Sequence, residues 1–216
     1  MRRRLLFGPL AGALFAIGVA GLALMIPGYS HVRQTVSEIG EIGSPARVLF
    51  AVMLCAVAVC ILVFASAVRD LSLAAHRSRL PAYLIGCMAF SAAGVGLFAH
   101  PHPLHNVFAI SELIGYQAPL VFALTWRRDP QAKTLVALSW LLYFLILAAI
   151  PLNLSALDRQ GVIWSWVEPA YGLAQRTLFA AWFGWCALLG MFLAQPQWHQ
   201  PLSREVSRGT RPPANR

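Results

Sequence analysis

The sequence predicts an all-α membrane protein: a six-helix transmembrane bundle with both termini cytoplasmic. Three observations support this prediction. The 216 residues are 58% hydrophobic and only 12% charged, which is about half the charged share of a soluble domain. Six apolar stretches are each long enough to cross a hydrocarbon layer roughly 30 Å thick. The loops between these stretches alternate in charge, and thirteen of the seventeen Lys and Arg residues fall on one side.

The expected spans fill most of the chain up to residue 194. Ser44-Pro45 and Pro81 are typical helix starts for the second and third spans. We therefore expect residues 1–194 to form one membrane domain and residues 195–216 to form a basic, disordered cytoplasmic tail. The six spans are expected at residues 5–26, 48–68, 81–99, 107–126, 134–154 and 172–194.

The basic residues predict the orientation of the chain. They cluster before the first span, after the second, after the fourth and beyond the sixth, whereas the opposite loops hold only Arg33, Arg47 and Arg159. The positive-inside rule places the clusters in the cytoplasm. It also explains the formal charge of +9, so the expected partners are membrane lipids and no nucleic acid. The four cysteines all lie within expected spans, which predicts no disulfide framework.

The first outward loop, from Pro27 to Pro45, carries a motif with two readings. Thr35-x-x-Glu38 fits a capping box, in which Glu38 closes the start of a short helix. Alternatively, His31 and Glu38 contribute to a binding site on the outer side. The residues alone leave both readings open.

The same loop resembles a known family. Tyr29-Ser-His followed by Thr35-Val-Ser-Glu-Ile-Gly40, directly after a first membrane helix, is similar to the signature of a bacterial membrane family catalogued as domain of unknown function 998. A Leu104-His105 pair at the start of span four extends the resemblance to most of the chain. The family's Pro-Cys-Asp element is replaced here by Ala99-His-Pro-His-Pro, so no role for an Asp or Cys carries over. The resemblance implies a six-span protein of the bacterial inner membrane, without implying a reaction.

The second outward loop contains three histidines in six residues. His100, His102 and His105 are candidate ligands for a transition metal such as zinc, because imidazole suits such ions. Two prolines in the same segment restrict how the rings can converge. The alternative is a short turn whose histidines meet headgroups or water.

Two charges are expected within the bilayer. Glu112 follows His105 by about 10 Å of helix, and His105, Glu112 and Tyr116 share one helical face. Arg176 lies in the last span at a similar depth. Because a charge at this depth costs several kcal/mol, such groups normally pair, and we predict a Glu112–Arg176 ion pair. That pair either only orients two helices or forms part of an outward polar pocket with His105, Tyr116 and Gln117.

These observations favour a non-enzymatic function, in which an outward polar pocket binds a lipid or small amphiphile or supports an assembly. One alternative is an intramembrane metal-assisted hydrolase acting on a lipid or acyl group, with Glu38 or Glu112 as the base. Another is a small transporter, although the broken helices typical of transporters are not evident in the sequence. The candidate pocket residues are His31, Glu38, His105, Glu112, Tyr116 and Arg176.

Overall fold

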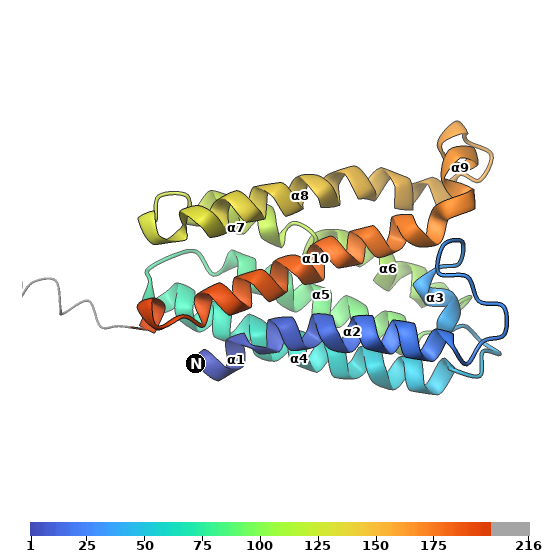
Figure 1. Cartoon of the computed structure of the whole chain (residues 1–216), viewed down its shortest axis with the longest axis horizontal. Coiled ribbons are helices and arrows are strands. Elements are labelled where there is room, and N and C mark those ends of the chain that lie inside the picture. Colours follow the sequence, from blue (N-terminus) through green and yellow to red (C-terminus); the bar gives the residue numbers. More distant parts are fainter. Residues whose placement is uncertain (200–216) are drawn as a thin grey trace, which may run out of the picture.

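The computed structural model describes residues 1–199, and its long helices run side by side along one axis (Figure 1). Within this part of the chain the structure is helical throughout, without strands. In chain order the helices are α1 (Arg2–Leu5), α2 (Phe7–Ala23), α3 (Val36–Ile39), α4 (Arg47–Ala74), α5 (Leu80–Leu97), α6 (Pro103–Gly115), α7 (Ala118–Trp126), α8 (Lys133–Leu154), α9 (Val162–Val167) and α10 (Tyr171–Leu193). Short 3-10 turns are η1 (Pro130–Ala132), η2 (Ser155–Leu157), η3 (Glu168–Ala170) and η4 (Pro196–His199).

Six helical segments are long and apolar enough to cross a membrane, and each overlaps one of the six predicted spans. This confirms the predicted all-α, six-span fold, while the cytoplasmic location of the termini stays a prediction. The segments are Arg2–Ala23, Arg47–Ala74, Leu80–Leu97, Pro103–Trp126, Pro130–Leu157 and Val162–Leu193.

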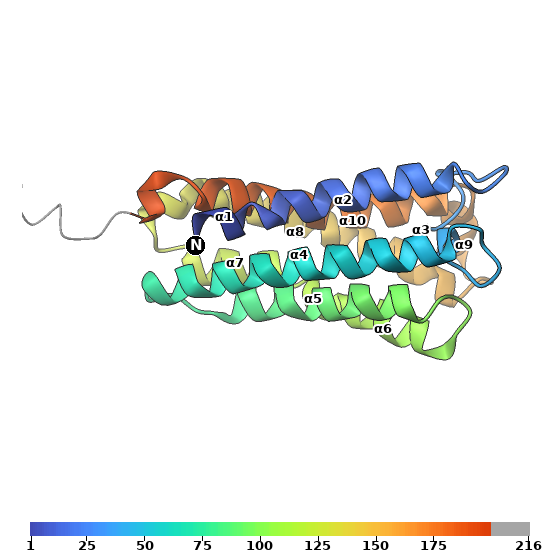
Figure 2. The ribbon, with the colours of Figure 1, turned by 90° about the horizontal axis from the view of Figure 1, so that it is seen from below.

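The connections and short helices gather at the two ends of the bundle (Figures 1 and 2). We call one the basic end: it holds Met1, the α4–α5 and α7–α8 connections, and the last described residues. The other, which we call the cleft end, holds α3, the α5–α6 turn and α9. Of the predicted tail, residues 195–199 are described, and Trp198 packs against Trp126 with ring centroids 5.9 Å apart. Residues 200–216 lie outside the described part of the chain.

The core is built around large buried aromatic side chains. Helix α4 packs on α5 and α2, and α10 packs on α8 and α2. Trp182 and Trp185 of α10 are almost fully buried, and the indole nitrogen of Trp185 donates to Ser139 Oγ of α8 at 2.8 Å. A buried Trp normally finds a partner for its N–H group, and this bond joins the two helices.

Span four is not the continuous helix that the sequence predicts. It is interrupted at Tyr116 and Gln117, where α6 ends and α7 begins. The physical reason is Pro119, which has no N–H group to donate to the carbonyl oxygen of Gly115 four residues earlier. That oxygen instead accepts a hydrogen bond from Trp182 Nε1 at 3.2 Å. Beyond the break, α7 packs on α8, whereas α6 packs mainly on α5.

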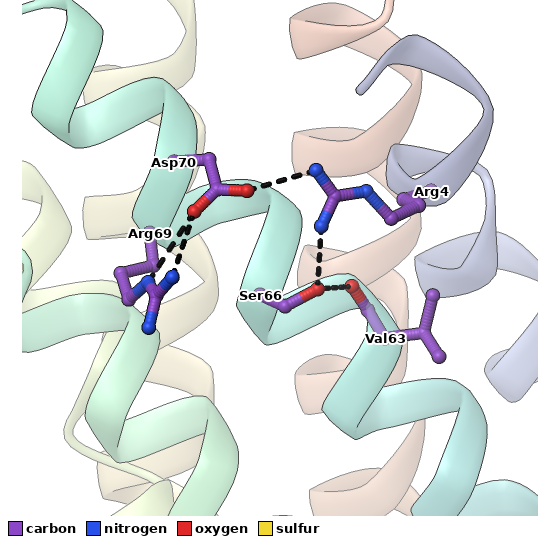
Figure 3. Close-up of polar contacts among 5 residues, drawn as sticks. All are labelled: Arg4, Val63, Ser66, Arg69 and Asp70. Carbon is purple, nitrogen blue, oxygen red and sulfur yellow. Dashed lines mark hydrogen bonds and ion pairs between the residues drawn. The ribbon is translucent and has the colours of Figure 1, made fainter.

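Charged residues at the basic end form ion pairs. Arg4 donates to Asp70 Oδ2 at 2.8 Å and to Ser66 Oγ at 3.2 Å, while Arg69 reaches the other oxygen of Asp70 (Figure 3). Ser66 in turn donates to the carbonyl oxygen of Val63. These contacts attach α1 to α4. A third ion pair, between Arg77 and Asp129 at 3.4 Å, links the α4–α5 and α7–α8 connections.

Candidate functional site

The cleft end contains a cavity with a volume of about 560 Å³. It lies between α6 on one side and α8 and α10 on the other, and α3 contributes to its wall. The break in span four explains its position, because α7 stays against α8 while α6 is packed on α5. The side chains that could act chemically in it include those of Glu38, Glu41, His105, Glu112, Asn153 and Gln175.

Glu112 lines the cleft one turn before the break, and Tyr116 lines it at the break itself. Tyr116 is 2% exposed, and its hydroxyl donates to Glu112 Oε2 at 3.0 Å. No other described side chain donates to this carboxylate, and Glu112 lines the cleft. Both residues also line a much smaller apolar cavity, of about 30 Å³, on the side of the bundle core. They therefore separate a polar cleft from an apolar interior.

The opposite wall of the cleft is held by amide side chains. Asn153 of α8 donates from Nδ2 to the carbonyl oxygens of Ala149 and Ala174, at 2.9 and 3.2 Å. Its Oδ1 accepts from no described residue. Gln175 of α10 accepts from the backbone N–H of Val36 at 2.6 Å. The two amides thus join α8, α10 and α3, and Asn153 adds an open acceptor to the cleft.

The predicted Glu112–Arg176 ion pair is wrong. Arg176 donates to the carbonyl oxygen of Gln34 at 2.7 Å, to that of Gly172 at 3.0 Å and to Tyr29 Oη at 2.7 Å. The reason is the helical position of Arg176. The cleft is lined by Tyr171, Gln175, Leu178 and Phe179 of α10, and one residue further along a helix turns the side chain by about 100°.

Arg176 instead fixes the loop between α2 and α3 to α10. The Tyr29 hydroxyl, which accepts from Arg176, in turn donates to the carbonyl oxygen of Thr35 at 2.6 Å. Burial raises the pKa of the Tyr29 phenol, and the Arg176 guanidinium acts in the opposite direction, so the phenol remains a neutral donor at pH 7. Gly172 permits the close approach, since a Cβ there would lie 2.7 Å from the carbonyl oxygen of His31.

Glu38 adopts the capping role that the motif predicts, and it also reaches the cleft. Its Oε1 accepts from the backbone N–H of Thr35 at 2.9 Å, while Thr35 Oγ1 accepts from the backbone N–H of Glu38. Gln34 donates to the other carboxylate oxygen at 2.9 Å. Glu38 is therefore largely occupied with holding the loop. His31 is exposed, packs edge-on against Tyr29 and does not line the cleft.

The three histidines of the second loop do not point to one place. His100 and His105 both line the cleft, with ring centroids 5.8 Å apart. His105 is 4% exposed, and its Nδ1 lies 2.8 Å from the carbonyl oxygen of Phe98. His102 caps α6, with its Nδ1 accepting from the N–H of Leu104. Among residues 1–199 no group of three or more His, Cys, Asp or Glu side chains is placed to hold a metal ion.

Several residues of the cleft were not predicted as site residues. Glu41, Asn153, Arg159 and Gln175 come from separate segments that only the tertiary structure brings together. The break in span four had a local signal, because Pro119 lies inside a predicted helix. Gln117, which was expected in the pocket, points elsewhere: it donates to the carbonyl oxygen of Leu113 and accepts from the hydroxyl of Tyr143.

Comparison with known proteins gives one match. A family model described as "Protein of unknown function (DUF998)" matches residues 9–192. This confirms the resemblance predicted from the Tyr29-Ser-His and Thr35–Gly40 motifs. No curated protein and no solved structure matches the chain. Since the family description states no activity, the function has to be argued from the cleft.

Proposed function

The chain belongs to the DUF998 family of proteins of unknown function, and we propose that this multi-pass membrane protein binds a lipid or another small amphiphile in the cleft. The proposal includes an orientation: the protein resides in a bacterial inner membrane with both termini cytoplasmic, which turns the cleft outward. The clusters of Arg at the basic end support that orientation through the positive-inside rule.

The observation that carries the proposal is the division of the cleft into polar and apolar parts. Glu112, Asn153 and Gln175 supply polar groups, while Ile110, Leu113, Ile150, Leu154 and Leu157 supply apolar surface. Binding sites for small molecules are mostly apolar, with a few polar groups that fix the ligand's orientation. A cavity of about 560 Å³ falls within the usual range of roughly 300–1,000 Å³ for such sites. An amphiphile matches both parts at once.

Lipid binding in the cleft can be tested with a substitution that fills the cleft. An Ala109→Trp substitution places an indole on the α6 wall of the cleft. The matched control is Ile114→Trp, because Ile114 lies on the same helix, is 53% exposed and does not line the cleft. Both variants and the wild type would be purified from membranes, and their bound lipid would be extracted and quantified by mass spectrometry. We expect the Ala109→Trp protein to retain several-fold less lipid than the other two.

Folding must be matched for that comparison to be valid. Circular dichroism and size-exclusion chromatography would show whether all three proteins have the same helix content and size. Equal lipid retention by correctly folded Ala109→Trp protein would contradict the proposal.

One observation favours a second candidate function, a small transporter. Transporters often bind their substrates where a membrane helix is interrupted, and span four is interrupted at Tyr116 and Gln117, next to Glu112. In proteoliposomes, a transporter would move a substrate from one compartment to the other. Lipid retention without such movement would favour the binding function.

A further inference from the structure

The charge of the cleft indicates what kind of headgroup it accepts. Three carboxylates line the cleft, those of Glu38, Glu41 and Glu112, against one guanidinium, that of Arg159. Arg159 is exposed and lies over the ring of Trp164 at 5.4 Å, in the connection between η2 and α9. The cleft is therefore net acidic, and its only described Arg or Lys is an exposed one.

Glu112 is the one carboxylate of the three that lies within a membrane-spanning helix. It lies nine residues after Pro103, or about 14 Å along the helix, which is close to the middle of the span. Its hydrogen bond from Tyr116 is neutral, and the ion pairs among the described residues all lie elsewhere. A carboxylate at this depth costs about 2.5–3.5 kcal/mol on insertion scales and usually pairs with a cation. Arg176, the nearest cation in the predicted scheme, is committed to Tyr29 and Gln34.

An opening toward lipid lies beside these acceptors. Ile110 of α6 is 50% exposed, Leu154 of α8 is 38% exposed and Leu157 of η2 is 73% exposed, and all three line the cleft. Because α6 and α8 face hydrocarbon in a membrane, an acyl chain can lie across these residues while its headgroup stays inside. This apolar rim is independent of the carboxylates, and it points to a ligand that comes from the bilayer.

Building on the proposed lipid-binding function, we infer that the ligand is an amphiphile with a cationic, amine-type headgroup. The headgroup nitrogen is placed against the oxygens of Glu112 and Asn153, and the chain leaves between α6 and α8. An ammonium group supplies both the positive charge and, where it carries hydrogens, the donors that these acceptors lack. An anionic headgroup would face Glu41 and Glu112 and be repelled.

The test compares three lipids that share dioleoyl chains and differ only in the headgroup. One carries a trimethylammonium group, one a phosphoglycerol group, and one is the neutral diacylglycerol. Delipidated protein in maltoside micelles would be offered an equimolar mixture, and the bound species would be counted by native mass spectrometry. We expect about tenfold more of the ammonium lipid than of either competitor, a ratio that corresponds to about 1.4 kcal/mol.

Variants assign that preference to Glu112. Glu112→Gln removes the charge, keeps an oxygen that accepts from Tyr116, and should strongly reduce the preference without abolishing binding. Glu168→Gln is the matched control, since this exposed carboxylate lies in η3 outside the cleft, and it should keep the preference. Where Glu112→Gln does not fold, Glu41→Gln replaces it and should reduce the preference in the same direction.

The possible outcomes separate the two proposals. Equal binding of all three lipids by the wild type, or an unchanged preference in a folded Glu112→Gln protein, overturns the inference about the headgroup alone. Retention of none of the three lipids overturns the proposed function as well.

Discussion

The two ends of the bundle treat their charges differently. At the basic end, Asp70 and Asp129 each bind at least one Arg, and every ion pair among the described residues lies there. At the cleft end, Glu38, Glu112 and Arg176 instead bond to backbone groups or neutral side chains. Charges that are paired within the protein hold helices together and offer a ligand few free charged groups. A charge without an ionic partner at membrane depth is costly, and this cost at Glu112 is the reason for the proposed ligand.

The largest effect is expected when the contacts of Arg176 are removed. Arg176→Ala removes hydrogen bonds from a charged donor to Tyr29, Gln34 and Gly172, and should lower the free energy of unfolding by about 2–4 kcal/mol. SDS titration in mixed micelles would measure that loss.

A double-mutant cycle then identifies the partner. Arg176→Ala and Tyr29→Phe should show a coupling of about 0.5–3 kcal/mol, whereas Arg176→Ala and Glu112→Gln should add within about 0.5 kcal/mol. A strong coupling between Arg176 and Glu112 would instead support an ion pair between these two residues and contradict the structure.

A smaller effect is expected from crowding the contact between α10 and the first loop. Gly172→Ala would bring a Cβ against the carbonyl oxygens of His31 and Gln34, and such overpacking typically costs about 1–3 kcal/mol. Gly184→Ala on the same helix is the control, because a Cβ at Gly184 meets nothing within 4 Å. It should be neutral or slightly stabilising, since Ala exceeds Gly in helix propensity by up to about 1 kcal/mol. Similar melting temperatures for the two variants would mean that the loop does not need this close approach.

The smallest effect is expected at the basic end. Asp70→Asn removes both ion pairs of Asp70, but the side chains of Arg4 and Arg69 are 41% and 49% exposed. Exposed pairs contribute only about 0–1 kcal/mol and weaken in salt. Unfolding of the wild type and the variant at low and high ionic strength would measure both the difference and its screening. A loss larger than that from Arg176→Ala would reverse the ranking of the two ends.

Features set by local chemistry could be predicted from the sequence. The six spans follow from runs of apolar residues, and the capping role of Glu38 follows from a four-residue motif that closes on itself. Glu38, His105, Glu112 and Tyr116 were predicted as pocket residues, and they do line one cleft. His31 and His102 lie outside it, because His31 packs against Tyr29 and the ring of His102 caps α6.

The partners of the buried charges could not be predicted in the same way. The sequence predicts an ion pair between Glu112 and Arg176 because their charges are opposite and their depths in the membrane are similar. However, each residue of a helix points in a different direction around the helix axis. Arg176 lies one position away from the face that lines the cleft, and its partner Tyr29 is 147 residues away in the chain. A hydrogen bond across that distance depends on how α10 is rotated against the loop.

The six apolar helices were already contained in the sequence, because the thickness of the hydrocarbon layer acts on each segment separately. The cleft was decided only by the tertiary structure. Pro119 frees the carbonyl oxygen of Gly115, but Trp182 has to come from α10 to satisfy it. Only then can α6 leave α8 and open a cavity between them. Local sequence sets which bonds a segment lacks, and the packing of distant segments determines what replaces them.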